Sequence, residues 1–237
     1  MTEKHIQRTI FIISEIDRMY PHNPCTFGLP ICFKNGSTDY DSIEMQFRDE
    51  WVWRKLVAGI LCCNESASKV RSFCSKILFV ELPSPDAFVK NRDSVEKLIK
   101  PCFKYWENIV PRLIKIAEYL VENDNKLPRT IEGLMEFEGV GEHIAELIVA
   151  NCFSNQSVFP VDRHVIRICE RLELGMDDIM KSTMNLAALS SKMVSFGSEI
   201  CSYKPECEKC FLREICRFDG TDRKVGEEIV QLDFPGL

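Results

Sequence analysis

Four cysteines near the C-terminus are the residues whose type and spacing most directly predict chemistry. Cys201, Cys207, Cys210 and Cys216 are separated by five, two and five residues. Four thiolates can bind either a zinc ion or a [4Fe–4S] cluster. The spacing differs from the paired CxxC motifs of a zinc ribbon, but taken alone it leaves both metals open. We therefore expect a metal centre held by these four thiols.

A single aspartate, Asp162, is the candidate catalytic residue. It stands in the segment PVDRHV (160–165), immediately before an amphipathic helical pattern. Aspartate is a preferred N-cap, and a capping carboxylate that accepts backbone N–H groups stays ionised. An ionised carboxylate in a cleft can stabilise a developing cation or activate water. The capping role and the catalytic role of Asp162 are therefore compatible.

Two glycines, Gly139 and Gly141, flank Val140 in a short turn between two helical patterns. Glycine permits the positive φ angles and the close backbone approach that a tight turn needs. Such a turn exposes amide N–H groups at the start of the second helix, where a phosphate oxygen can bind. Phosphate contacts of this kind position a protein on DNA without reading its sequence. An ordinary helix C-cap explains an isolated GxG as well, so the interpretation depends on the motifs that follow.

The elements that position these residues are predicted to be helices. Apolar residues recur at helical spacing in many short segments, and no segment shows sustained period-two alternation. In the first segment, Ile6, Ile10, Ile13 and Ile16 are expected to form the apolar side. Proline and glycine residues predict a loop over residues 21–40. The predicted helices are 4–20, 49–63, 65–80, 95–100, 105–123, one on each side of the glycine turn, and one from about 165.

Three local signals set expected helix boundaries. Ser84 or Asp86 is expected to cap the helix that follows the break at 83–85, and Thr130 to start the helix before the glycine turn. Pro111 must lie in the first turn of its helix or kink it. The tail from 219 to 237 is expected to be loosely held.

Composition indicates an ordinary globular chain. The 237 residues are 45% hydrophobic and 28% charged, enough for one domain or two small ones. The net charge of −6 counts against a simple phosphate-binding surface, although residues 51–216 are close to neutral with 22 basic and 23 acidic residues. Eight further cysteines lie mostly in apolar settings and are expected to be small buried hydrophobes. They are residues 25, 32, 62, 63, 74, 102, 152 and 169.

No apolar run approaches the roughly 18 residues of a membrane span. The apolar segment 10–13 is too short for a signal peptide. We therefore expect an intracellular protein, cytoplasmic in a prokaryote, with no membrane partner and no disulfides.

Taken in order, the motifs resemble those of the helix–hairpin–helix DNA glycosylase superfamily, in the iron–sulfur branch with endonuclease III and the mismatch glycosylases. The resemblance covers about 51–218. It rests on the GVG turn (139–141), on VDRHV (161–165) and on GSEICSYKPECEKCFLREIC (197–216).

The resemblance implies an all-α fold of two helical lobes with a DNA-binding cleft between them. One lobe would be a six-helix barrel over 51–160, with the helix–hairpin–helix at 131–153. The other would be a cluster lobe built from 1–50 and 161–218, followed by a tail at 219–237. The four cysteines would then hold a [4Fe–4S] cluster.

The resemblance also implies base excision on double-stranded DNA by a monomer. The target nucleotide is flipped out and its N-glycosidic bond is cut. Asp162 would stabilise the oxocarbenium-like sugar and assist water, and Gly139, Val140 and Gly141 would contact the DNA backbone. Asn64 falls where relatives place a polar side chain into the space left by the flipped base.

Two lysines lie within the cysteine motif. Lys204 and Lys209 lie on the cysteine loops, where a cluster could hold them against phosphate. The wedge-loop region, 99–105, lacks the glycine usual in relatives, so the resemblance does not identify an intercalating residue.

Departures from the family pattern narrow the expected activity. Bifunctional members carry a lysine just after the hairpin, where this chain has His143, and imidazole cannot form a Schiff base with the sugar. His143 could instead bind phosphate or position water. We therefore expect a monofunctional glycosylase with weak or absent lyase activity. Neither Gly59 nor Ile60 supplies the acidic residue of adenine-mismatch members, which favours thymine or uracil in mismatches, or another modified base.

Three alternatives stay open on the sequence. The first is a catalytically inactive DNA-binding or damage-sensing protein on the same fold. The second is a bifunctional glycosylase/lyase that uses a different lysine. The third is an unrelated zinc-binding module.

Overall fold

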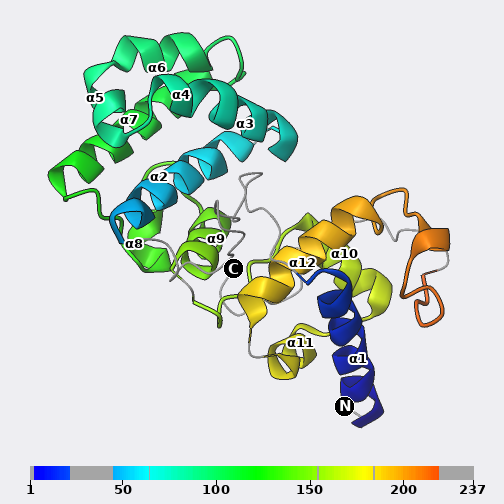
Figure 1. Ribbon diagram of the computed structural model, residues 1–237. Coiled ribbons are helices and arrows are strands. Elements are labelled where there is room, and N and C mark those ends of the chain that lie inside the picture. The colour runs from blue at the N-terminus through cyan, green and yellow to red at the C-terminus, as the bar shows by residue number, and fades with distance from the viewer. Residues whose placement is uncertain (1–2, 22–44, 64, 154, 184, 219–237) are drawn as a thin grey trace.

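The computed structural model describes residues 3–21, 45–63, 65–153, 155–183 and 185–218. Every regular element in these ranges is a helix, and none of the ranges contains a strand (Figure 1). The all-α prediction is therefore confirmed. The predicted loop at 21–40 beyond residue 21, Asn64 and the tail 219–237 lie outside the described residues.

The helices are short and follow one another closely along the chain. In order they are α1 (Glu3–Met19), α2 (Met45–Cys62), α3 (Ala67–Phe73), a π-helix (Cys74–Leu78), α4 (Phe79–Glu81), α5 (Pro85–Lys90), α6 (Arg92–Ile99), α7 (Trp106–Glu122), α8 (Ile131–Met135), α9 (Glu142–Cys152), α10 (Arg163–Leu172), α11 (Met176–Ser182), α12 (Leu186–Glu199) and a 3₁₀ turn (Cys207–Lys209).

A first hydrophobic core is built from the helices between α2 and α9. Trp53 of α2 and Phe88 of α5 are fully buried and meet edge to face, with ring centroids 5.1 Å apart. Phe103, in the loop between α6 and α7, packs in the same way on Phe73 at 5.0 Å. Each large apolar side chain buried in this way contributes about 1.5–3 kcal/mol. The 100–105 loop is therefore anchored to the core at Phe103.

A second hydrophobic core joins both ends of the described chain. It contains residues of α1, α10, α11 and α12 together with the cysteine-containing segment. Arg8 of α1 fixes this arrangement, since its Nη1 donates to the Leu172 carbonyl at 2.7 Å and its Nη2 to the Ile215 carbonyl at 3.2 Å. The N-terminal helix is therefore joined to the end of α10, which Asp162 caps, and to the cysteine-containing segment.

The prediction that Ile10 belongs to the buried side of α1 is wrong. Ile12 and Ile16 are fully buried, whereas Ile10 is 45% exposed. The buried stripe of α1 also includes Thr9 and Ile13, so the stripe runs through positions 9, 12, 13 and 16. Ile10 lies off this stripe because each residue turns the helix by about 100°.

The predicted helix starts are largely confirmed. The Ser84 hydroxyl accepts from the Ala87 amide at 3.3 Å, and the Thr130 hydroxyl from the Gly133 amide at 3.1 Å. Pro111 lies inside α7, beyond its first turn. The helix expected over 65–80 is interrupted by the π-helix, and the one expected from 95 begins at Arg92.

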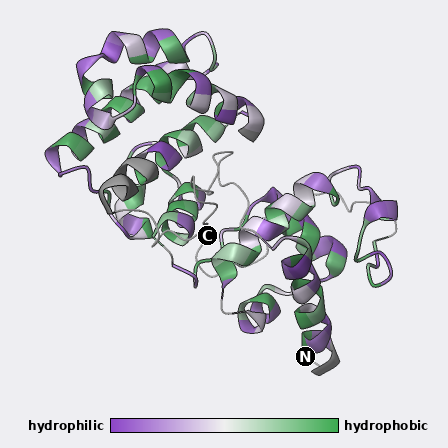
Figure 2. Cartoon of the chain, viewed as in Figure 1, coloured by the Kyte–Doolittle hydropathy of each residue, from purple (hydrophilic) through white to green (hydrophobic). Residues whose placement is uncertain are grey.

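Helix α9 contacts both cores. It packs on α2 of the first core and on α12 of the second, and the Ser191 hydroxyl of α12 lies 3.3 Å from Oδ1 of Asn151. Figure 2 shows hydrophobic and hydrophilic residues side by side on the same helices, as expected for amphipathic elements. Within the described ranges no helix is both long and apolar enough to cross a membrane.

Candidate functional site

The turn before α9 contains a glycine that the chain itself requires. Gly139 has φ +90°, a conformation that side-chain-bearing residues rarely adopt. A Cβ at this position would lie 2.7 Å from Cδ of Arg112 on α7. The turn is therefore held against α7 by a close contact that only glycine allows.

Gly141 is different, because nothing in the described chain requires a glycine there. Its backbone is extended, with φ −83°, and a Cβ would meet no atom within 4 Å. Between the two glycines, the side chain of Val140 is buried in the first core, and its amide donates to the Phe137 carbonyl at 3.0 Å. Open space therefore lies in front of Gly141 and the start of α9.

The N-terminus of α9 has no side-chain cap. By contrast, Thr130 caps α8 and Asp162 caps α10. The first amides of an α-helix have no acceptor within the helix, so those of α9 can donate to an external anion. Glu142 lies in this first turn and adds a negative charge to it. Burial and, to a smaller extent, the charge of Glu142 raise the pKa of Glu146.

Ion pairs hold the turn in place from α7. Glu138 accepts from Nε of Arg112 and from Nζ of Lys115, each at 3.3 Å. Hydrogen bonds from Lys115 and then Arg112 lower the pKa of the Glu138 carboxyl. The turn is thus fixed by contacts on both sides of Gly139.

Asp162 is the N-cap of α10, as predicted. Its Oδ1 accepts from the amides of His164 at 2.8 Å and Val165 at 2.9 Å. No hydrogen bond to its Oδ2 is found from any other described residue. One carboxylate oxygen therefore orients the side chain, and the other remains available to a substrate or to water.

The fold brings His143 and Asp162 together from α9 and the start of α10. The His143 side chain is exposed, yet desolvation by surrounding protein atoms lowers its pKa. The nearby Asp162 carboxylate and a hydrogen bond to the backbone of Val161 act in the opposite direction. The candidate catalytic aspartate therefore has an imidazole beside it.

The four predicted metal ligands line one cavity of about 370 Å³ in the second core. Cys201, Cys207, Cys210 and Cys216 share its wall with Arg171 of α10. Nη1 of Arg171 donates to Sγ of Cys201 at 3.3 Å and to the Ser202 carbonyl at 2.6 Å. Burial raises the pKa of the Cys201 thiol, and the hydrogen bond from Arg171 counteracts this.

The donor set of this cavity, four thiols, is one that a cluster takes. Among the described residues, no three His, Cys, Asp or Glu side chains converge on a position that would hold one metal ion. In a [4Fe–4S] cluster each thiolate binds its own iron, so the four sulfurs surround a larger volume. Four thiols around one cavity, with a guanidinium at its wall, suit such a group.

The remaining predicted site residues are less closely defined. Lys204 is exposed beside the cysteines, and Lys209 is paired with Glu206. The expectation that the scattered cysteines are buried is confirmed for Cys74 and Cys152 but is wrong for Cys63, which is exposed at the end of α2.

Two arginines near the site are missing from the sequence prediction. Arg112 supports the glycine turn and Arg171 contacts a cysteine sulfur, but both lie in helices with no recognisable motif. Only the positions of Arg167 and Arg171 on one face of α10, four residues apart, could have indicated a shared target.

No protein-family model matches the chain. Several curated proteins do. Endonuclease III homolog 2 (chloroplastic) of Arabidopsis thaliana is 31% identical over 156 residues, which cover 57% of this chain and 40% of that relative. Endonuclease III of Thermotoga maritima is 29% identical over 158 residues, which cover 61% of this chain and 73% of the relative. Endonuclease III of Rickettsia conorii is 26% identical, with 69% and 82% covered.

Solved structures share the fold over almost the whole chain. A non-covalent endonuclease III–DNA complex aligns with a TM-score of 0.69 at 21% identity, covering 90% of this chain and 95% of that one. A thermostable thymine-DNA glycosylase aligns with a TM-score of 0.65 at 19% identity, covering 92% and 98%. At these identities the likeness establishes the fold.

Proposed function

We propose that the chain acts as a member of the endonuclease III family of helix–hairpin–helix DNA glycosylases, to whose proteins its sequence is similar, and that it removes a damaged or mismatched base from double-stranded DNA by hydrolysis. We propose further that the first core, with the glycine turn, and the second core, with the cysteines, form two lobes that bind the duplex between them.

One observation carries the proposal: an uncapped helix N-terminus and a half-satisfied carboxylate lie on neighbouring elements. The free amides of α9, with open space in front of Gly141, suit a phosphate oxygen of the DNA backbone. Asp162 is held by Oδ1 alone. Binding of the backbone at α9 would therefore bring a sugar of the same strand to the carboxylate.

The reaction follows from the charge that must develop on that sugar. As the bond between C1′ and the base nitrogen breaks, the base departs with the electron pair and later takes up a proton, while the positive charge left on the sugar is stabilised by the Asp162 carboxylate. Water then forms the new bond to C1′, and Asp162 accepts its proton. The lowered pKa of His143 favours its neutral form, in which the imidazole can orient this water.

The replacement of a lysine by His143 carries the monofunctional part of the proposal. Imidazole has no primary amine, so it cannot form a Schiff base with C1′. Borohydride trapping of a covalent protein–DNA complex would overturn this assignment and favour a lyase that uses another lysine.

Cys201, Cys207, Cys210 and Cys216 are proposed to hold a [4Fe–4S] cluster. With one cysteine on each iron, the cluster would supply rigidity to the segment that bears Lys204, with no open iron for substrate. Iron and sulfide analysis of the purified protein tests this. Zinc without iron would contradict it.

The proposed activity is tested on duplexes that each carry one lesion: uracil or thymine opposite guanine, an oxidised pyrimidine, and adenine opposite 8-oxoguanine. We expect alkali-labile sites with one or more of the first three and none with the last. Asp162→Asn should abolish these sites while duplex binding persists. If no lesion yields alkali-labile sites and Asp162→Asn binds duplex DNA as the wild type does, the results favour a damage-sensing protein without glycosylase activity.

A further inference from the structure

The exposed face of α3 and of the π-helix that follows it is basic and contains no carboxylate. Its residues are Ser68, Lys69, Arg71, Ser72, Ser75 and Lys76, all of which are exposed. At about 100° per residue these positions cover roughly 160° of the helix circumference, with the serines in the middle and cations at both edges. The opposite side of the helix packs on the first core through Val70, Phe73 and Cys74. The solvent-facing side therefore presents ammonium, guanidinium and hydroxyl groups together.

The cations of this face are only weakly engaged within the protein. Nζ of Lys69 lies 2.8 Å from Oε1 of Glu65, and both side chains are partly exposed, so this ion pair contributes at most about 1 kcal/mol. The side chains of Arg71 and Lys76 have no hydrogen-bond or ion-pair partner within the part of the chain that the structure describes. An external anion can therefore bind these groups without breaking a strong internal contact.

A depression next to α3 extends the basic surface. It has a volume of about 420 Å³, and Lys69, Lys100 and Lys104 all line it. Nζ of Lys100 lies 4.2 Å from the centroid of the Trp106 ring. Attraction to the face of an aromatic ring holds an ammonium group close to the protein surface. The depression therefore presents positive charge at a fixed place. We call the exposed face of α3 and this depression together the α3 surface.

The α3 surface has a charge opposite in sign to that of the whole chain. It gathers five cations, against two carboxylates that pair with them, whereas the chain has a net charge of −6. The cations are Lys69, Arg71, Lys76, Lys100 and Lys104, and the carboxylates are Glu65 and Glu96. A local excess of positive charge on an acidic protein favours a polyanionic partner.

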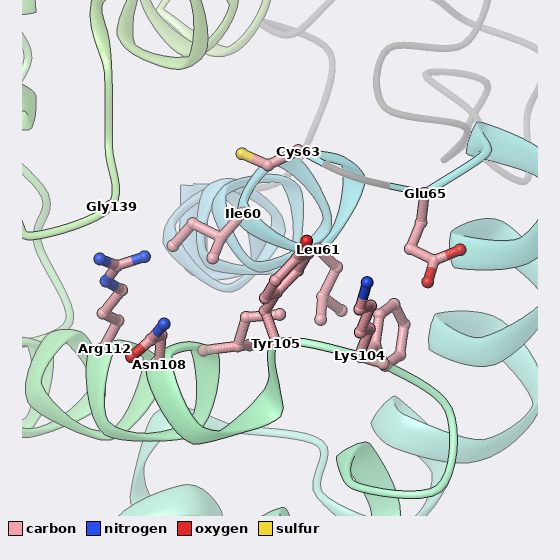
Figure 3. Close-up of a pocket in the computed structure, with 11 residues that line it drawn as sticks. Ile60, Leu61, Cys63, Glu65, Lys104, Tyr105, Asn108, Arg112 and Gly139 are labelled. Carbon is pink, nitrogen blue, oxygen red and sulfur yellow. The ribbon is translucent and has the colours of Figure 1, made fainter.

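The α3 surface is continuous with the glycine turn. The depression shares Phe103 and Lys104 with a pocket of about 220 Å³ that extends to Arg112 and Gly139. Figure 3 shows Lys104 on the side of this pocket away from Gly139. A partner with regularly spaced phosphates can therefore contact the start of α9 and the α3 surface at once, whereas a single small anion cannot.

The residue types and the length of the α3 surface suit the backbone of a duplex. Lysine, arginine and serine side chains are typical phosphate ligands in protein–DNA complexes. From Ser68 to Lys76 the helix is about 12 Å long at 1.5 Å per residue. Duplex DNA carries one phosphate per about 1.7 Å of its axis, so several phosphates lie along such a length.

We propose that the α3 surface is a second phosphate-binding surface, separate from the amides of α9, and that it holds the duplex on one side of the target nucleotide. The proposal rests on the function proposed above for the identity of the partner, duplex DNA. Contacts with the backbone read no base, so the α3 surface adds affinity for every sequence. It accounts for DNA binding by a chain whose net charge is negative.

Hydroxyl-radical footprinting tests where the α3 surface contacts the duplex. A tetrahydrofuran abasic analogue in the duplex fixes the position of the protein and has no base to excise. The wild type should protect sugars around the analogue and further along the duplex on one side. A triple variant, Lys69→Gln with Arg71→Gln and Lys76→Gln, should lose the outer protection and keep the protection around the analogue.

The salt dependence of binding counts the phosphates involved. Fluorescence anisotropy on the same duplex gives the affinity at several salt concentrations. The logarithm of the affinity falls with the logarithm of the salt concentration by about 0.9 for each neutralised phosphate. The slope of the triple variant should therefore be smaller in magnitude than that of the wild type by about 2 to 3.

A matched control separates the α3 surface from the total charge. Lys97→Gln with Lys126→Gln and Lys181→Gln makes the same change in net charge at three exposed positions outside the α3 surface. This control should keep the footprint and the salt slope of the wild type. Ser72→Glu, a single exposed change, places a carboxylate in the middle of the face and should weaken binding about 3-fold at low salt and less at high salt. Equal urea midpoints show that each variant is folded.

A wild-type footprint and salt slope in the triple variant would overturn the proposal and favour an acidic protein as the partner of these cations. Equal losses in the control would overturn it as well, because the total charge would then explain the effect. Excision plays no part in these measurements. If no lesion yields alkali-labile sites but the footprint of the triple variant is shortened, the α3 surface stands and the proposed activity fails. If excision occurs and the footprint is unchanged, the reverse holds. Absence of duplex binding by the wild type would overturn both.

Discussion

The two glycines of the turn before α9 should respond to alanine in opposite ways. Gly139→Ala should lower the stability of the protein, whereas Gly141→Ala should lower DNA affinity and leave stability nearly unchanged. The sequence treats these positions alike, but the structure separates a glycine that the chain needs from one that only an external partner could need.

The magnitudes follow from the geometry. At φ +90° an alanine is strained, and its Cβ would lie 2.7 Å from Cδ of Arg112. Such strain costs about 1–3 kcal/mol, so we expect a loss of about 2 kcal/mol for Gly139→Ala. At Gly141 the Cβ meets nothing, and an uncapped N-terminus changes by only about 0.5 kcal/mol. A methyl group there would push a phosphate away from the α9 amides. A hydrogen bond to a charged group is worth about 1.5–3 kcal/mol, and its loss predicts about a 10-fold weaker complex.

Urea unfolding and anisotropy on an undamaged duplex measure the two effects separately. DNA affinity is measured for the wild type and for Gly141→Ala at several salt concentrations. A backbone amide carries no net charge, so the loss of its contact with a phosphate should leave the number of released counterions, and hence the salt dependence, unchanged. The reasoning is refuted if Gly141→Ala binds DNA as the wild type does, or if Gly139→Ala is as stable as the wild type.

Three further predictions concern charged groups. Glu142→Gln should strengthen DNA binding about 3-fold at low salt and have no effect at high salt, because it removes a carboxylate from the first turn of α9; titration at both salt concentrations checks this. Because the pKa of folded His143 is lowered, the unfolded chain binds more protons just below the ordinary histidine pKa, and stability falls as pH falls through that window. His143→Gln should therefore lose less stability than the wild type between pH 7.5 and pH 5, measured as urea midpoints. Arg171→Met should reduce the iron bound per protein, whereas Arg171→Lys should reduce it less; a metal content equal to that of the wild type in both would contradict the role of the Cys201 contact.

Features set by neighbouring residues were predictable from the sequence. Thr130, Ser84 and Asp162 all cap helices as expected, because an N-cap depends on a side chain and amides two or three residues away. The all-α class was predictable for the same reason, since helical periodicity is local. The four cysteines line one cavity because their short spacing keeps them close.

Features set by tertiary contacts were not predictable. The packing of Arg112 against Gly139 joins α7 to the turn, and no motif marks either contact. The same holds for the electrostatic interaction between His143 and Asp162, which depends on where the fold places the start of α9 relative to the start of α10. The exposure of Ile10 depends on which side of α1 meets α11 and α12. In each case the sequence does not specify which residue a side chain will contact, because the contact depends on how distant helices pack.

Helix α10 explains why the cysteine segment and the carboxylate belong to one structural unit. Asp162 caps its N-terminus, while Arg171, in its last turn, bonds to Sγ of Cys201 and the carbonyl of Ser202. Arg167, between them, donates to the carbonyls of Cys201 and Gly197. Because a helix of ten residues is stiff along its axis, a displacement of the cysteine segment would move or unwind α10 and shift the position of its cap. A group bound by the cysteines can therefore stabilise the position of Asp162 without touching the substrate.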